Sequence, residues 1–147
     1  MDTTTINRIL RSEPSTRHQY SGCFPSDALR LPHSYPSAVV ANLDPMDRPG
    51  SHWVALYMRS PTRVDYFDSY GLPPIGDIGR FLANFKERTT NNCIIQSVNS
   101  RVCGHYCIFF LTSRCRGLSY ERIITILTRQ RNPDSFVANY VTELCTL

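Results

Sequence analysis

The chain has 147 residues, of which 41% are hydrophobic and 19% are charged, so it can bury a core and does not belong to the disordered class. No apolar run approaches the roughly 20 residues of a membrane span, and the first residues lack the apolar stretch of a signal peptide. The net charge is +4, and fifteen of the sixteen basic residues are arginine. We therefore expect one domain, residues 1–147, that acts inside a cell as a monomer and away from membranes.

The first part of the chain predicts one helix followed by extended segments. Residues 3–12 carry apolar side chains at helical spacing, and Pro14 ends the pattern. Residues 20–24 fit a strand or an extended segment, and residues 24–27 fit a turn or a brief helix. The prolines within residues 30–37 then indicate a loop.

Three strands follow, and they form the most regular part of the pattern. They are predicted at residues 37–43, 52–58 and 64–68, where valine and aromatic residues are enriched. A turn-rich connector at 44–50 joins the first two strands, and a tight turn at 60–62 joins the last two into a hairpin.

The second half alternates between helix and strand patterns and ends in three helices. The predicted elements are a helix at 75–88, a strand at 92–96, and helices at 103–117, 119–129 and 133–144. Strands that are followed by a run of helices are typical of an α+β fold.

Cys103 is the candidate nucleophile. It opens a helix whose next residues are apolar on every side, which predicts a buried helix, and Asn99 or Ser100 is expected to cap it. A thiol in the first turn of a helix lies at the positive end of the helix dipole, which favours the thiolate and lowers the cysteine pKa.

His52 and Asp68 are the candidate base and orienting acid. They lie at the two ends of the predicted hairpin, so they are expected to be side by side, with the acid on one imidazole nitrogen and the thiol on the other. Asp65 competes with Asp68 for this role, but it faces the other side of its strand, and the strand end favours Asp68.

Gln96 is the candidate oxyanion donor. It precedes Cys103 by seven residues, and its side-chain amide is expected to act together with the backbone amide of Cys103. Taken singly, each of these four residues also fits a structural role: a strand-end histidine, a turn aspartate, a surface amide or a small core cysteine.

Other histidines and cysteines fit the chemistry less well. His105 points away from Cys103 on the same helix, and it does not share a face with Cys103 and Cys107, so no metal site is expected there. The cysteines are expected to be reduced thiols rather than a disulfide framework, and they occupy positions 23, 93, 103, 107, 115 and 145.

The arginines of the last third allow two interpretations. They can form a nucleic-acid-binding surface, or they can belong to solvated helix faces in an arginine-biased composition. The candidate DNA contacts are Arg114, Arg116, Arg122, Arg129 and Arg131.

The sequence blocks around these residues resemble the adenain-type cysteine peptidases, which include the adenovirus maturation protease and its relatives in other DNA viruses and virus-like transposons, and which are distant kin of the ubiquitin-like-protein proteases. The blocks are Pro-Gly-Ser-His-Trp-Val-Ala around His52, Tyr-Phe-Asp-Ser-Tyr-Gly around Asp68, and the seven-residue step from Gln96 to Cys103. The resemblance covers about residues 20–115.

This resemblance implies a papain-like α+β fold in which helices pack a central mixed or antiparallel sheet. It implies the catalytic order His52, Asp68, Cys103, with Gln96 in the oxyanion hole and Trp53 packed beside the site. The implied activity is cleavage of viral precursor proteins near glycine during particle maturation, in the virion and the host nucleus. No cofactor is needed for the chemistry, but DNA and a short viral peptide activate relatives.

Two alternatives to this function remain open. The same chemistry can remove a ubiquitin-like modifier from a conjugate, and a catalytically inactive chain of this fold can serve as a DNA-binding protein.

Overall fold

The computed structural model describes residues 1–43 and 52–146. The predicted connector at 44–50 lies outside these residues. In chain order the elements are α1 (Thr3–Ser12), β1 (Tyr20–Pro25), the 3₁₀ helix η1 (Ser26–Ala28), β2 (Ser37–Asn42), β3 (Trp53–Ser60), β4 (Arg63–Phe67), α2 (Gly76–Leu82), β5 (Glu87–Thr90), α3 (Cys103–Cys115), α4 (Tyr120–Thr128) and α5 (Pro133–Thr146).

The strands form one mixed sheet in the order β1-β2-β3-β4-β5. The two central pairs, β2–β3 and β3–β4, are antiparallel, whereas each edge strand runs parallel to its neighbour. The antiparallel pairing continues past the end of β3, because the amide of Leu43 donates to the carbonyl of His52 at 3.0 Å. The sheet therefore fixes the backbone at His52 even though β3 begins at Trp53.

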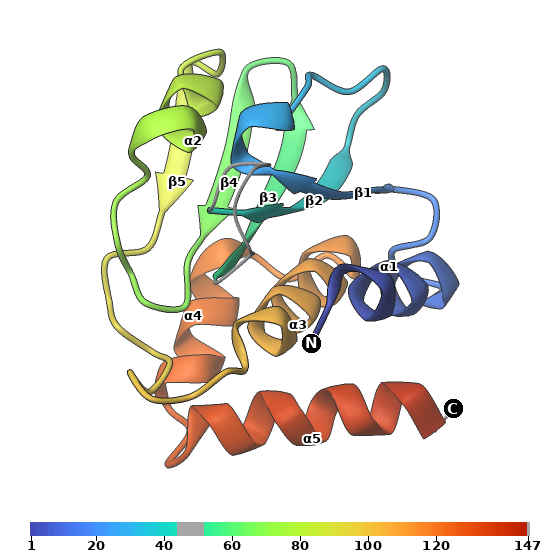
Figure 1. Cartoon of the computed structure of the whole chain (residues 1–147), viewed down its shortest axis with the longest axis vertical. Coiled ribbons are helices and arrows are strands. Elements are labelled where there is room, and N and C mark those ends of the chain that lie inside the picture. Colours follow the sequence, from blue (N-terminus) through green and yellow to red (C-terminus); the bar gives the residue numbers. More distant parts are fainter. Residues whose placement is uncertain (44–51, 147) are drawn as a thin grey trace.

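Helices cover both faces of the sheet, as Figure 1 shows. On one face, alternate strand residues such as Ala55 and Tyr57 pack into a core that is shared with α1, α3, α4 and α5. On the other face, the intervening residues such as Val54 and Leu56 pack against α2. This alternation follows from the period of two along a strand, and it confirms the α+β class and the mixed sheet with helices around it.

Helix α3 is the centre of the larger core. Its residues from Tyr106 to Leu111 are all buried, because the sheet lies on one side of the helix and other helices cover the rest. Cys103 and Gly104, which open α3, are buried too, so Cys103 is held on a packed helix.

Two predicted elements were wrong. The helix predicted at 75–88 ends at Leu82, because the chain turns there and Phe85 reaches the core from outside the helix. The strand predicted at 92–96 is irregular, and the strand lies earlier, at Glu87–Thr90. That strand is a polar edge strand, so it carries no hydrophobic alternation to reveal it.

Candidate active site

The hairpin brings His52 and Asp68 into direct contact. The pairing of Ala55 with Phe67 places the two residues at the same end of β3 and β4. His52 Nε2 lies 2.6 Å from Asp68 Oδ1, and the two residues are only 8% and 1% exposed. This is the predicted arrangement of a base and its orienting acid.

Cys103 lies close enough to His52 for the two side chains to shift each other's pKa. The His52 ring and the backbone amide of Trp53, the residue that follows His52, both favour the thiolate form of Cys103. Burial alone would raise the pKa of Cys103, but these two groups outweigh it, so the pKa is lowered.

His52 is shifted in the opposite direction. Burial alone would lower its pKa, but the hydrogen bonds with Asp68 and Cys103 favour the charged ring and raise the pKa to about 9. A lowered thiol pKa beside a raised imidazole pKa favours a thiolate–imidazolium pair.

Asp65, the alternative acid, lies elsewhere. Its carboxylate accepts hydrogen bonds from Arg114 Nε at 3.0 Å and Nη2 at 2.8 Å, on the sheet face that carries α3. This contact leaves Asp68 as the acid beside His52.

The prediction that Arg114 contacts DNA was wrong. Arg114 is buried, its guanidinium stacks 4.6 Å from the ring centre of Tyr57, and its Nη1 donates to the carbonyl of Leu118. Arg116 is also engaged, with Glu13 at 2.7 Å.

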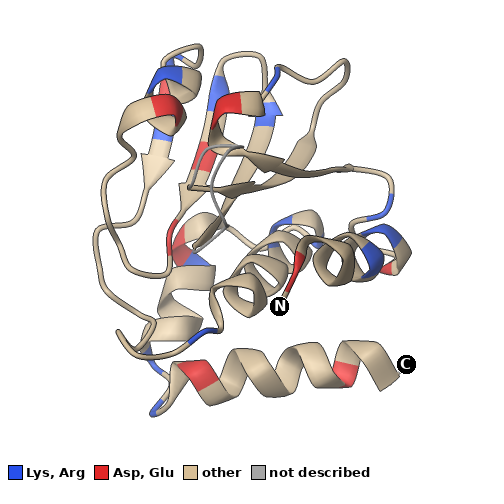
Figure 2. Cartoon of the chain, in the orientation of Figure 1, with Lys and Arg blue, Asp and Glu red and all other residues tan. Residues whose placement is uncertain are grey.

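Three predicted DNA-contact arginines remain exposed on α4 and just beyond it: Arg122, Arg129 and Arg131. Figure 2 shows that basic positions occur in both the sheet layer and the helix layer.

Gln96 is 1% exposed and lies beside the loop that leads to Cys103. Its Oε1 accepts from Ser69 Oγ at 2.6 Å, and its Nε2 donates to the carbonyl and the hydroxyl of Ser100 at 3.1 and 2.9 Å. Ser100 therefore does not cap α3 as predicted. Nor does Asn99: the N-cap is Val102, without a side-chain hydrogen bond. The oxyanion role of Gln96 stays a prediction.

Sequence reasoning missed three residues that contact the site. Asn91 binds both backbone groups of Asp68: its Oδ1 accepts from the amide at 3.0 Å, and its Nδ2 donates to the carbonyl at 2.6 Å. Ser69 binds Gln96, and the ring of Tyr70 stacks on His52 with centres 4.6 Å apart. Ser69 and Tyr70 belong to the recognised block around Asp68, whereas nothing local in the sequence marks Asn91.

Trp53 contributes to the site through its backbone. Its amide reaches the thiol of Cys103, and its side chain is partly buried against the larger core. The role of the Trp53 side chain beside the site stays a prediction.

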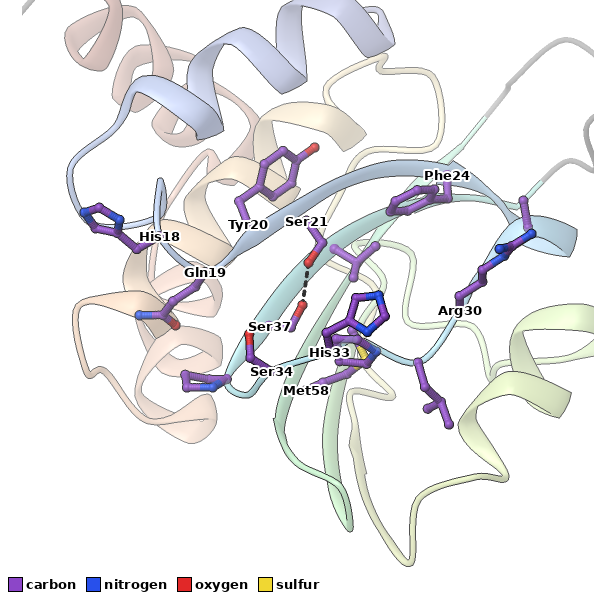
Figure 3. A pocket seen from close by; sticks show the side chains of 15 residues that line it. His18, Gln19, Tyr20, Ser21, Phe24, Arg30, His33, Ser34, Ser37 and Met58 are labelled. Carbon is purple, nitrogen blue, oxygen red and sulfur yellow. Dashed lines mark hydrogen bonds between the residues drawn. The ribbon is translucent and has the colours of Figure 1, made fainter.

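A groove of about 490 Å³ lies apart from this site, over β1 and β2 (Figure 3). His18, Arg30 and His33 line it, and Ser21 and Ser37 share a hydrogen bond of 2.7 Å within it. A smaller cavity of about 310 Å³ is bordered by Asp68 and by apolar residues near α2. Neither space is lined by Cys103 or Gln96.

The residues that the structure describes contain no group of three His, Cys, Asp or Glu side chains placed to hold a metal ion. All six cysteines are free thiols. Within the same residues, no helix is long and apolar enough to span a membrane.

Comparison with known proteins gives one relative in sequence. No family model matches the chain. The chain is 27% identical over 110 residues to a cysteine protease of African swine fever virus, a match that covers 66% of this chain and 40% of the relative. The chain therefore spans less than half the length of this curated relative.

Solved structures share the fold. A crystal structure of the African swine fever virus protease matches with a TM-score of 0.66 at 20% identity, over 92% of this chain and 65% of that one. The central domain of an uncharacterised protein from Legionella pneumophila matches with a TM-score of 0.56 at 14% identity, over 97% of this chain and 94% of that one. ChlaDub1 from Chlamydia trachomatis matches with a TM-score of 0.52 at 14% identity, over 96% of this chain and 76% of that one.

Proposed function

We propose that the chain is an adenain-like cysteine endopeptidase that cleaves precursor proteins of a virus or virus-like element during particle maturation, as its similarity to the African swine fever virus protease supports. The observation that carries this proposal is the contact chain from Cys103 through His52 to Asp68, with the thiol pKa lowered and the imidazole pKa raised. Its viral setting is supported by the relative from African swine fever virus.

In the proposed reaction, His52 takes the proton of Cys103 and Asp68 holds the resulting imidazolium. The thiolate attacks the carbonyl carbon of the scissile peptide bond, and the carbonyl oxygen takes the negative charge. The amide of Gln96 and the backbone N–H of Cys103 stabilise that oxygen. His52 then gives its proton to the leaving amine, which leaves a thioester on Cys103. Water hydrolyses the thioester, with His52 as the base, and regenerates the thiol.

The test is cleavage of a panel of glycine-containing peptides by the wild-type chain and by two variants. We expect Cys103→Ala to abolish cleavage, because no nucleophile remains. We expect Gln96→Ala to fold normally and to lose roughly 10²–10³ in kcat, the typical cost of one oxyanion donor. Cleavage that survives in Cys103→Ala at the wild-type rate would rule out this mechanism.

A second candidate is removal of a ubiquitin-like modifier by the same chemistry. The fold does not separate the two substrates, since ChlaDub1 and the viral protease match the same chain. A fluorescent modifier conjugate, assayed beside the peptide panel, distinguishes them: processing of the conjugate alone favours the second candidate.

DNA and a short viral peptide are proposed as activators, and the exposed arginines of α4 support the DNA part. In the described part of the chain, no carboxylate lies within ion-pair distance of Arg122, Arg129 or Arg131. Cysteine-dependent cleavage that is stimulated by double-stranded DNA would support activation. DNA binding without any cleavage, with or without a peptide activator, would instead favour an inactive DNA-binding protein.

A further inference from the structure

The turn that follows β4 supplies Asp68 and contacts both His52 and Gln96. Asp68 accepts from His52, Ser69 donates to Gln96, and Tyr70 stacks on His52. The turn is closed by the amide of Gly71, which donates to the carbonyl of Asp68 at 2.8 Å. We infer that Ser69 and Tyr70 are positioning residues: Ser69 sets the direction of the Gln96 amide, and Tyr70 fixes the His52 ring. This inference rests on the proposed peptidase function.

Ser69 holds Gln96 through two hydrogen bonds and the preceding residue, Ile95, through a third. Its hydroxyl donates to Gln96 Oε1 at 2.6 Å, and its carbonyl accepts from the amides of Ile95 and Gln96, both at 2.9 Å. The backbone of Gln96 and the far end of its side chain are therefore held by one residue, which is itself 1% exposed.

Chemistry decides which end of the Gln96 amide faces which partner. The carbonyl of Ser100 can only accept, so the group 3.1 Å from it must be the amide nitrogen. The amide oxygen then faces Ser69, and the Ser69 hydroxyl must donate. Nε2 also donates to the hydroxyl of Ser100 at 2.9 Å. A substrate oxyanion can take the place of this hydroxyl, while the hydrogen bond from Nε2 to the carbonyl of Ser100 keeps the amide in position. Without the Ser69 hydroxyl, the buried Oε1 loses its donor, and the amide is free to turn away from the oxyanion.

Tyr70 acts on the His52–Asp68 pair. Its ring lies 4.6 Å from the imidazole, centre to centre, with an angle of 29° between the planes. Its backbone amide donates at 2.9 Å to Asp68 Oδ1, the same oxygen that contacts His52. The ring limits the tilt of the imidazole, and an aromatic face also favours the charged imidazolium.

The role of Ser69 is tested by a double-mutant cycle with Gln96. We expect Ser69→Ala to lower kcat roughly 10- to 100-fold, which is less than the roughly 10²–10³ cost of removing an oxyanion donor, because the Gln96 amide is displaced and not deleted. If Ser69 acts through Gln96, the double variant Ser69→Ala/Gln96→Ala is no slower than Gln96→Ala alone. Losses that multiply in the double variant would overturn this role.

The matched control is Ser37→Ala, which removes another buried serine with a hydroxyl–hydroxyl bond of 2.7 Å, far from the site. It is expected to keep kcat within about 3-fold of wild type, whatever it does to stability, because surface and remote substitutions act mainly on the fold. Thermal unfolding of each variant checks that the rates refer to folded protein. A wild-type chain that cleaves nothing contradicts the proposed function itself, whereas multiplicative losses in an active chain contradict only the inference.

The role of Tyr70 is tested by the titration of His52 in the Cys103→Ala background, followed by NMR, which needs no activity. We expect Tyr70→Leu to lower the His52 midpoint by roughly half a pH unit, the size of an aromatic–cation contact, and Tyr70→Phe to leave it unchanged. An unchanged midpoint in folded Tyr70→Leu would overturn the role of the ring.

Discussion

At the scale of single residues, the pKa of His52 is raised and that of Cys103 is lowered, and these two shifts predict how activity varies with pH. His52 keeps its proton up to about pH 9, above its ordinary value of 6.5, because its bonds to Asp68 and Cys103 outweigh burial. The imidazolium is needed to protonate the leaving amine, so we expect kcat/KM to fall as pH rises through about 9. At lower pH, kcat/KM should rise as Cys103 loses its proton, and this rise should occur below the ordinary cysteine pKa of 9.0 because the pKa of Cys103 is lowered.

Asp68→Asn checks the cause of the fall at high pH. The substitution replaces the carboxylate that raises the pKa of His52 by a neutral amide. The fall of kcat/KM at high pH should therefore move to lower pH, and the rate should drop. A pH–rate profile for the two proteins on one peptide measures both effects, and a falling limb that stays near pH 9 in Asp68→Asn would contradict the assignment.

Asn91 offers a prediction about stability. Asn91→Ala leaves the amide of Asp68 buried without a partner and removes one of the two donors to its carbonyl, which keeps the amide of Gly71; this should cost about 1–3 kcal/mol of unfolding free energy. Urea denaturation measures the loss. The control Asn84→Ala removes one hydrogen bond of an exposed residue, to the carbonyl of Phe81, and should cost at most about 0.5 kcal/mol. Equal losses in the two variants would show that Asn91 is not a special support of Asp68.

Residues of the site could be predicted from the sequence where they lie on regular elements. His52 and Asp68 follow from the ends of a hairpin, and Cys103 follows from the start of an apolar helix. Asn91 could not be predicted, because it depends on a contact across 23 residues and on Tyr120, whose hydroxyl donates to Asn91 Oδ1 at 3.1 Å.

At the scale of elements, the segment after β4 is hydrogen-bonded to the segment after β5, and the two backbones approach closely at Gly71. Gly71 has a φ of +66°, and a Cβ added there would lie 2.4 Å from the carbonyl oxygen of Cys93. Gly71→Ala should therefore push the two segments apart, and with them Asp68 and Gln96.

Gly76 provides a matched control for this substitution. Its φ is +62°, but an added Cβ would meet nothing within 4 Å. Gly76→Ala should cost about 1–2 kcal/mol from backbone strain alone, whereas Gly71→Ala should cost several kcal/mol more and lower kcat as well. Denaturation curves and peptide cleavage report the two effects, and equal costs at the two positions would contradict the close approach.

The sequence predicted the central elements better than the peripheral ones. The hairpin of β3 and β4 and the buried α3 have strong periodic patterns, and both were found. Strand β5 was missed because its residues, Glu87–Thr90, are polar, and it pairs with β4 along one edge only. Residues 92–96 were predicted as a strand. In the structure Ile94 is exposed and Gln96 is buried, and the amides of Ile95 and Gln96 both donate to the carbonyl of Ser69 instead of pairing with a neighbouring strand.

At the scale of the whole molecule, the arginines divide into structural and exposed groups. We expect the triple variant Arg122→Ala/Arg129→Ala/Arg131→Ala to weaken DNA binding and to reduce the slope of log K against log salt by about 2–3, if each residue meets one phosphate. Fluorescence anisotropy over a salt series measures the slope. An unchanged slope would show that these three arginines do not contact DNA phosphates.

Arg114→Ala is the contrasting variant. It leaves Asp65 buried without its partner, so it should cost about 3–5 kcal/mol of stability while the DNA affinity of the folded protein stays the same. The α+β class could be predicted at this scale. The division of the arginines could not, because burial of Arg114 follows from the packing of α3 on β4, which the sequence does not state.

The protonation of three other thiols, Cys23, Cys107 and Cys115, has a practical consequence. Burial raises the pKa of Cys23 and Cys115 to about 11, and it raises that of the fully enclosed Cys107 well above the ordinary value. Cys103 is shifted the other way. An alkylating reagent at neutral pH should therefore react with Cys103 in preference to the other three thiols, because Cys103 has the largest fraction of thiolate among the four. The fraction of molecules alkylated at Cys103 would then measure how much of a preparation has a competent site, before any substrate is known.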